Sequence, residues 1–276
     1  MRTRTVAAIV TTVVTLAIGI VLAGCGHGSV PRSAAGAVTT STSMRTSRPG
    51  PRKPVVHKRR AEPPSVPAGS SFAAQATGSS IAVYAEANAS TPTEILPNPW
   101  KVDPARASTS VAQVFLIDSS QRADGWIHVL LPVRPNGSTG WVRASSVVVR
   151  RIDYHIRVQL SQHRITVFNG TRVLYEGLVA VGAPRTPTPT GSYYTRVLIK
   201  APNPRTIYGP YAYGLSSHSD ALSSFDGGDA EIGIHGNDDV SALGRNVTHG
   251  CIRMDNTAIT LLASVLPLGT PVDIVQ

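Results

Sequence analysis

The residues best suited to chemistry are one cysteine and two histidines close to the C-terminus. His235 lies in an Ile-His-Gly segment, and Cys251 follows a Thr-His-Gly tripeptide at 248–250. A thiol reacts as its thiolate, and a neighbouring imidazole can take the proton because the histidine pKa lies near neutral pH. His235 precedes Cys251 by sixteen residues, a spacing that fits two neighbouring strands joined by a loop. The pattern therefore predicts a nucleophile, Cys251, and a general base, His235.

The residue before Cys251 favours a sharp turn. Gly250 lets the backbone bend, so that the N–H groups of Cys251 and its neighbours can point at a developing oxyanion. Two other interpretations stay open at this level. The thiol can be an inert core residue beside core histidines, or four residues can form a zinc set. That set would be His218, His235, His249 and Cys251, with gaps of 17, 14 and 2 residues, unlike compact structural zinc patterns.

The spacing of these residues resembles a known signature. His235 followed by Thr248-His249-Gly250-Cys251 is similar to the motif of the YkuD-type L,D-transpeptidases. The resemblance extends over about 152–276. It includes Thr188-Pro189-Thr190-Gly191, Gly209-Pro210-Tyr211-Ala212-Tyr213-Gly214 and Gly233-Ile234-His235-Gly236. Many members carry Asn two residues after the cysteine, where this chain has Arg253.

The resemblance implies an acyl transfer between peptidoglycan stem peptides, which serve as donor and acceptor. It implies a thioester intermediate on the cysteine, release of D-alanine, a 3→3 cross-link, and covalent inhibition by β-lactams of the carbapenem class. No metal or organic cofactor is expected. The implied catalytic residues are Cys251, His235, His249, Thr248 and Gly250. The implied substrate-binding residues are Tyr211, Tyr213, His218, Gly236 and Arg253.

Three rival functions belong to other classes or other reactions. An L,D-carboxypeptidase would use water as acceptor with the same acyl-enzyme. A non-catalytic lipoprotein would only bind the cell wall. Papain-like or NlpC-type endopeptidases place Cys before His in the chain, whereas His235 precedes Cys251 here, and this order argues against them.

The N-terminus resembles a bacterial lipoprotein signal. A short basic start precedes an apolar run from Val6 to Leu22, and Leu22-Ala23-Gly24-Cys25 is similar to a lipobox. In that family the cysteine is lipidated and cleavage occurs just before it. Residues 1–25 are therefore predicted to be a signal peptide, with lipidation at Cys25. The mature protein would be extracytoplasmic, anchored to the outer face of the cytoplasmic membrane. An uncleaved membrane anchor is the alternative.

The net charge of +10 is concentrated outside the predicted folded part. Residues 26–60 carry eight basic residues and no acidic one, and after position 60 sixteen basic residues balance sixteen acidic ones. A nucleic-acid-binding domain would concentrate its charge on a folded face, so no nucleic-acid partner is expected. Residues 26–78, rich in Pro, Ser and Thr, are predicted to form a disordered basic tether.

The rest of the chain shows mainly strand patterns, which predict a mostly β protein. Residues 79–150, with Trp126 and Trp141 around a 136–140 turn, resemble a small SH3-like β-barrel that binds wall or orients its neighbour. Residues 151–276 are predicted to be the catalytic domain, a YkuD-like β-sandwich or barrel. We expect strands near 152–160, 165–167, 173–175, 178–181 and 272–274, and an irregular insertion at about 201–230. One short helix is expected at about 257–266, capped by Asp255 or Asn256.

Overall fold

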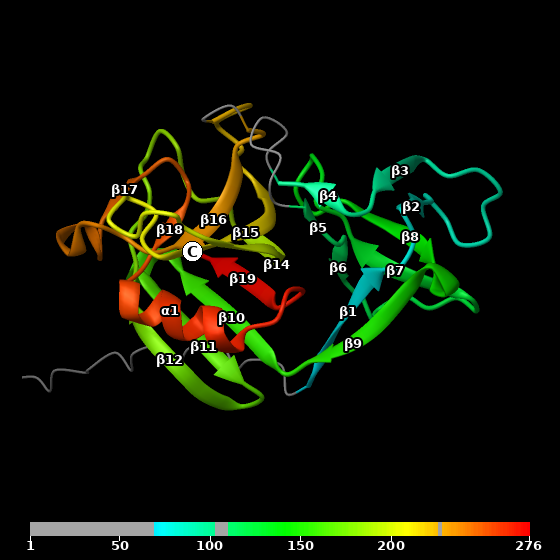
Figure 1. The fold of residues 1–276 in the computed structure, drawn as a ribbon, viewed down its shortest axis with the longest axis horizontal. Coiled ribbons are helices and arrows are strands. Elements are labelled where there is room, and N and C mark those ends of the chain that lie inside the picture. The colour runs from blue at the N-terminus through cyan, green and yellow to red at the C-terminus, as the bar shows by residue number, and fades with distance from the viewer. Residues whose placement is uncertain (1–68, 103–109, 226–227) are drawn as a thin grey trace, which may run out of the picture. The chain divides into compact units, whose positions relative to one another are not determined.

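The computed structural model describes residues 69–102, 110–225 and 228–276, and these belong to one compact unit (Figure 1). The predicted signal segment with Cys25, and most of the predicted tether, lie outside the described residues. Within the described ranges, no helix has both the length and the hydropathy needed to cross a membrane.

The C-terminal half is built on a mixed eight-stranded sheet with the order β12-β11-β10-β19-β14-β15-β16-β18. Its strands are β10 (Tyr154–Gln159), β11 (Arg164–Asn169), β12 (Arg172–Leu178), β14 (Gly191–Lys200), β15 (Tyr211–His218), β16 (Glu231–His235), β18 (Ile252–Arg253) and β19 (Pro271–Val275). Most neighbours are antiparallel, but β19 pairs with β10, and β18 with β16, in parallel. Because a parallel pair needs a long connection, the chain between β16 and β18 forms the loop that leads to Cys251. Within that loop, β17 (Asn246–Thr248) forms a small parallel pair with β13 (Val181–Gly182).

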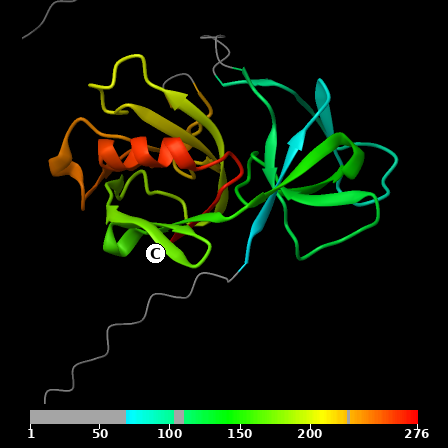
Figure 2. The ribbon, with the colours of Figure 1, turned by 60° about the horizontal axis from the view of Figure 1, so that its bottom comes forward.

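One α-helix, α1 (Asn256–Val265), covers part of this sheet (Figure 2). Asp255 caps it, because its carboxylate accepts from the N–H groups of Thr257 and Ala258 over 2.8 and 3.0 Å. The helix buries Ile259 and Leu262 in the main core, which also contains buried side chains of β10, β11, β15, β16 and β19. The expected helix, its cap and the flanking strand at 272–274 are therefore confirmed.

The N-terminal half consists of short antiparallel strands. They are β1 (Ser71–Ala76), β2 (Ser80–Val83), β3 (Glu94–Pro97), β4 (Trp100–Lys101), β5 (Ser110–Val111), β6 (Val114–Leu116), β7 (Trp126–Leu130), β8 (Thr139–Arg143) and β9 (Val147–Ile152). Three short 3-10 turns occur in the described chain, at Ala144–Ser146, Leu160–Gln162 and Val240–Ala242. This half has its own core around Phe115, Val129 and Val142, all fully buried. The turn predicted between Trp126 and Trp141 is confirmed, since it connects β7 to β8.

Four features differ from the sequence predictions. Strand β1 lies inside the predicted tether, where it pairs with β6 on one side and β9 on the other and buries three alanines. The predicted boundary at 150/151 falls within β9. The expected irregular insertion at 201–230 contains β15, an eight-residue strand that buries Tyr213 and Leu215 between β14 and β16. The strand expected at 178–181 is instead the end of β12 and the start of β13.

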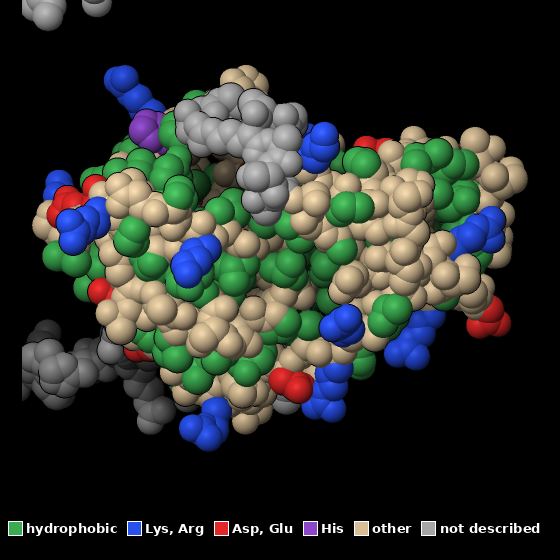
Figure 3. Space-filling model, in the orientation of Figure 1, with side chains coloured by type: hydrophobic (Ala, Val, Ile, Leu, Met, Phe, Trp, Pro, Cys, Tyr) green, Lys and Arg blue, Asp and Glu red, His purple; other side chains and the backbone are tan. Residues whose placement is uncertain are grey.

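Charged side chains are dispersed on the face shown in Figure 3, where Lys and Arg stand singly among polar and apolar atoms. This agrees with the near balance of acidic and basic residues after position 60. That face therefore carries no continuous basic stripe of the kind that tracks a phosphate backbone.

Candidate active site

The parallel pairing of β16 with β18 brings the predicted base and nucleophile to adjacent strands. His235 pairs with Arg253 in register, so both side chains leave the sheet on the same face. Two residues before His235 on β16, the Gly233 N–H donates to Cys251 Sγ over 3.4 Å. A Cβ built on Gly233 would lie 4.0 Å from that sulfur. Since residues 233 and 235 point to the same face of β16, the topology places the imidazole and the thiol on one side of the sheet.

His235 is almost fully buried, with 3% of its surface exposed. Its Nδ1 lies 2.7 Å from the carbonyl oxygen of Gly236. A carbonyl only accepts, so Nδ1 carries the proton and Nε2 keeps the lone pair that a base needs. Burial is the main cause that lowers the pKa of His235 to about 4. The charge of Arg253 also lowers this pKa, whereas the backbone carbonyls of Gly236 and Ile207 act to raise it. The imidazole is therefore neutral at pH 7.

The thiol of Cys251 is also neutral in this arrangement. Desolvation raises its pKa above the ordinary value, although the Gly233 N–H and the charge of Arg253 act to lower it. In the described part of the chain, the thiol and the imidazole make no hydrogen bond with each other. Catalytic hydrogen bonds are often long before substrate binds. The geometry fits proton transfer during attack rather than a preformed thiolate–imidazolium pair.

Threonine side chains hold the turn that presents Cys251. Thr248 Oγ1 donates to the Cys251 carbonyl over 2.6 Å. Thr188 Oγ1 donates to the Gly250 carbonyl over 2.8 Å, and Thr186 Oγ1 donates to the Thr248 carbonyl over 3.0 Å. The Thr248 hydroxyl therefore holds this turn in place. The sequence analysis gave Thr188 only as part of a motif and did not single out Thr186, because both hydroxyls reach this turn only through the fold.

The predicted oxyanion donors need a correction. The Gly250 N–H donates to Thr248 Oγ1 over 3.1 Å, so it is not available to a substrate. The Cys251 N–H has no acceptor among the described residues. In a trans peptide the N–H points away from the carbonyl, so this N–H points away from Thr188. Gly250 contributes its conformation instead: its φ is +120°, and a Cβ there would lie 2.8 Å from Ile232.

Two of the five predicted substrate-binding residues lie in the interior. Tyr213 is 1% exposed, and its hydroxyl donates to the carbonyls of Leu262 and Leu266 at the end of α1. His218 is 2% exposed, and its Nε2 lies 3.1 Å from Asp229. Both were predicted from a segment rich in tyrosine and histidine, and this segment is strand β15. The Tyr213 side chain packs in the main core, and the His218 side chain contacts Asp229 across the loop that follows β15.

The other predicted substrate-binding residues lie around His235. Tyr211 is partly buried, and its carbonyl accepts from the Gly236 N–H over 3.2 Å. Gly236 is buried and acts on His235 through its carbonyl. Arg253 is partly exposed beside His235, and its buried Nε has no hydrogen-bond partner in the described structure. Of this set, Arg253 is the charged residue, and its positive charge acts on both His235 and Cys251.

Aromatic rings flank the site on two sides. The ring of Tyr208 lies 5.1 Å from the ring of His235, and the ring of Phe225 lies 5.1 Å from that of His249. His249 is exposed, so it borders the approach to Cys251 rather than supporting it from within. Phe225 was not predicted, because no spacing in the sequence links it to the cysteine turn.

The four residues of the alternative zinc set are not arranged as metal ligands. Within the described ranges, no group of three or more His, Cys, Asp or Glu residues has a geometry that could hold a metal ion. His218 contacts Asp229, whereas the thiol of Cys251 contacts the backbone of Gly233.

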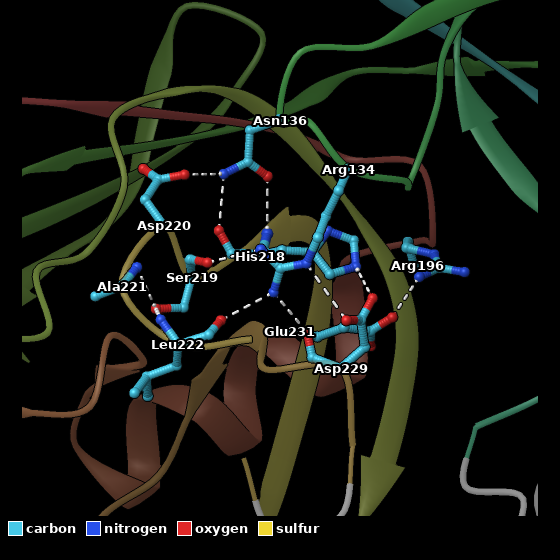
Figure 4. Close-up of polar contacts among 10 residues, drawn as sticks. All are labelled: Arg134, Asn136, Arg196, His218, Ser219, Asp220, Ala221, Leu222, Asp229 and Glu231. Atoms are coloured by element: carbon cyan, nitrogen blue, oxygen red, sulfur yellow. Dashed lines mark hydrogen bonds and ion pairs between the residues drawn. The ribbon is translucent and has the colours of Figure 1, made fainter. Parts of the chain in front are cut away.

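The loop that carries Phe225 is held at both ends by the turn between β7 and β8 (Figure 4). Arg134 donates to the carbonyls of Ser219, Leu222 and Asp229 over 2.8, 3.0 and 3.0 Å. Asn136 exchanges two hydrogen bonds with the backbone of His218, over 2.7 and 2.9 Å. The N-terminal half therefore supports a loop that borders the candidate active site.

Comparison with known proteins agrees with this geometry. A family model described as the L,D-transpeptidase catalytic domain, YkuD, matches residues 153–274. YkuD of Bacillus subtilis is 32% identical over 151 residues, which cover 52% of this chain and 84% of that protein.

Two solved structures illustrate the similarity. L,D-transpeptidase 3 from Mycobacterium tuberculosis, in complex with a faropenem-derived adduct, is 15% identical with a TM-score of 0.38, covering 59% of this chain and 91% of that one. The Ldtfm–avibactam carbamoyl enzyme is 23% identical with a TM-score of 0.33, covering 45% of this chain and 49% of that one. The chain thus spans about half the length of that second enzyme. On the strength of the Bacillus relative and the family model, the chain belongs to the YkuD family of L,D-transpeptidase catalytic domains.

Proposed function

We propose that this protein is a peptidoglycan L,D-transpeptidase that forms 3→3 cross-links through an acyl-enzyme on Cys251. The observation that carries the proposal is the β16–β18 pairing, which sets the thiol against Gly233 and the neutral imidazole of His235 on the same face. A neutral thiol beside a neutral base is the starting state for general-base attack on a carbonyl.

The first half-reaction releases D-alanine. Cys251 Sγ attacks the carbonyl carbon of the third residue of a tetrapeptide stem, while its proton moves to Nε2 of His235. The tetrahedral intermediate then breaks its C–N bond, and the imidazolium gives the proton to the departing amino group. A thioester and free D-alanine result.

The second half-reaction makes the cross-link. The side-chain amine of the third residue of a neighbouring stem attacks the thioester carbonyl, and the C–S bond breaks. His235 takes a proton from the amine and returns it to the sulfur. One peptide bond is exchanged for another, so no external energy source is needed.

Two groups at the site suit the charges of this reaction. The Cys251 N–H, without an acceptor among the described residues, would donate to the oxyanion of each tetrahedral intermediate. The Arg253 guanidinium, beside His235 on the next strand, would attract a carboxylate of the donor stem. Its charge also favours the thiolate form of Cys251 as the proton leaves.

The test uses the full chain with a disaccharide-tetrapeptide, followed by intact-protein mass spectrometry and analysis of the products. The expected result is a mass gain on Cys251 equal to the donor minus D-alanine, and a cross-linked dimer. Cys251→Ala protein should give neither. A tripeptide product without dimer would assign the protein as an L,D-carboxypeptidase. Wall binding without turnover in both proteins would favour the non-catalytic alternative.

A further inference from the structure

The peptide group between Gly236 and Asn237 is hydrogen-bonded on both sides. Its carbonyl accepts from Nδ1 of His235 over 2.7 Å, and its N–H donates to Oδ1 of Asn256 over 2.8 Å. Because a peptide group is planar and rigid, any rotation that breaks one of these bonds also strains the other. One amide therefore links the side chain of Asn256 to the imidazole of His235.

Asn256 is free for this contact because it does not cap α1. It is the first residue of the helix, and the preceding Asp255 supplies the capping carboxylate. The side-chain oxygen of Asn256 instead points at the backbone after β16. An asparagine at this position is therefore explained by its contact with residue 237 rather than by helix formation.

The same oxygen fills the junction between two glycines. A Cβ on Gly236 would lie 2.2 Å from Asn256 Oδ1, and a Cβ on Gly209 would lie 2.3 Å from it. Gly209 has a φ of +61°, so its backbone conformation also favours glycine. It directly follows Tyr208, whose ring lies 5.1 Å from that of His235. Asn256 thus packs against Gly236, whose carbonyl accepts from the imidazole, and against Gly209, which follows Tyr208. The imidazole is in contact with both the Gly236 carbonyl and the Tyr208 ring.

We infer that Asn256 is a positioning residue for His235, acting through the 236–237 peptide and the glycine junction; this inference rests on the proposed role of His235 as the base. Without Asn256 Oδ1, the Asn237 N–H loses its acceptor in a buried place and the peptide can turn. The Gly236 carbonyl then no longer holds the proton on Nδ1. The other tautomer, with the proton on Nε2, cannot take a proton from the thiol.

The test compares four variants of the full chain. Asn256→Ala removes the acceptor, and Asn256→Asp keeps an oxygen of the same shape but adds a negative charge. Asp255→Ala is the matched control, because it weakens the same end of α1 without touching residue 237. His235→Ala is the reference for loss of the base. The readouts are kcat, KM, the pH profile of kcat/KM, thermal unfolding, and the ¹⁵N chemical shifts of the His235 ring.

Asn256→Ala should lower kcat about 10- to 100-fold with little change in KM, as for other residues that orient a functional imidazole. Its ¹⁵N spectrum should show a mixture of tautomers where the wild type shows Nδ1–H alone. Asn256→Asp should recover most of kcat. It should also move the acid limb of the profile to higher pH, because a carboxylate favours the imidazolium. Arg253, whose charge acts on the imidazole, and Tyr208, whose ring lies against it, are unchanged in these variants.

The outcomes separate two kinds of failure. If Asn256→Ala keeps the wild-type kcat and tautomer, the inference is wrong while the proposed function stands. It is equally wrong if Asp255→Ala and Asn256→Ala lose activity in step with their loss of thermal stability. If His235→Ala itself stays active, the proposed base is wrong, and the role inferred for Asn256 fails with it. Should Asn256→Ala not fold, the pH shift of Asn256→Asp alone decides, and an unshifted limb overturns the inference.

Discussion

Thr248 Oγ1 donates a hydrogen bond of 2.6 Å to the carbonyl oxygen of Cys251, three residues further along the chain. The hydroxyl oxygen Oγ1 of Thr248 also accepts a hydrogen bond from the Gly250 N–H over 3.1 Å. Thr248 is buried, with 2% of its surface exposed, so water cannot replace either bond. The hydroxyl closes the turn on which the thiol and the free Cys251 N–H are presented.

Replacing Thr248 by alanine should therefore loosen the turn without removing any reacting group. We expect kcat/KM of Thr248→Ala to fall by about 10-fold and the protein to lose about 1 kcal/mol of stability. Thr248→Ser keeps the hydroxyl and should stay within about threefold of the wild type. Steady-state kinetics and urea unfolding measure the two effects. Equal losses in the serine and alanine variants would mean that the methyl group, and not the hydroxyl, matters.

The pH dependence of activity should reflect the buried state of His235. Burial lowers the pKa of His235 to about 4, and only the neutral imidazole can accept the thiol proton. Activity is therefore lost on acidification only as the pH falls through about 4, and not near the ordinary histidine value of about 6.5. The measurement is kcat/KM between pH 3.5 and 8, with the folded state monitored by circular dichroism. An acid limb centred near 6.5 would show that the imidazole is solvated in the working enzyme.

Local patterns in the sequence predicted those elements whose stability is local. The helix α1 follows from its apolar spacing and from Asp255, and β11 and β12 contain the strands expected near 165–167 and 173–175. The signature around Cys251 identified the nucleophile–base candidates. Such features depend on neighbours within a few residues, and these are visible in the chain itself.

The relationships that build the site could not be read in this way, because they join distant segments. Thr188 and Gly250 are 62 residues apart, and their contact exists only because β13 pairs with β17. Tyr213 looked like a substrate ligand in a polar, aromatic segment, yet the pairing of β15 between β14 and β16 turns it into the core. Asn256 looked like a helix cap, and only the path of the backbone after β16 shows its contact with residue 237.

The support that Arg134 and Asn136 give to the 218–229 loop leads to a third prediction. Removing both side chains takes away several bonds worth about 1 kcal/mol each, so the loop should open more often. In Arg134→Ala/Asn136→Ala protein, hydrogen exchange over 218–225 should rise by roughly tenfold or more. Arg143→Ala is the matched control, since Arg143 packs on Trp126 of the same half and has no bond to the loop. Unchanged exchange in the double variant would show that the loop is held by its own contacts.

A fourth prediction concerns location, which we propose to be the outer face of the cytoplasmic membrane. Cys25 lies outside the described residues, and the proposal rests on Leu22-Ala23-Gly24-Cys25 in the sequence. In a bacterial host, wild-type protein should partition with membranes and yield an N-terminal peptide with the mass of a lipidated cysteine. Cys25→Ser protein should lose both properties. Equal partition of the two proteins, with Cys25 unmodified, would exclude the lipid anchor.

The last prediction is that carbapenems acylate Cys251. A strained lactam carbonyl resembles the scissile carbonyl of the stem, so the thiol that attacks one should attack the other. The S–C bond forms, the lactam C–N bond breaks, and the ring nitrogen takes the proton that His235 removed from the thiol. The protein mass should therefore rise by the whole mass of the inhibitor.

His235→Ala should slow this step on the order of 10²–10⁴-fold, as expected for a lost general base. Thr248→Ala should slow it less, because it only loosens the turn. Intact-protein mass spectrometry over time gives all three rates, with Cys251→Ser as the control. A folded wild type without mass gain, or equal labelling of the serine variant, would show that Cys251 is not the nucleophile, because an alcohol in the same place is a far weaker one at neutral pH.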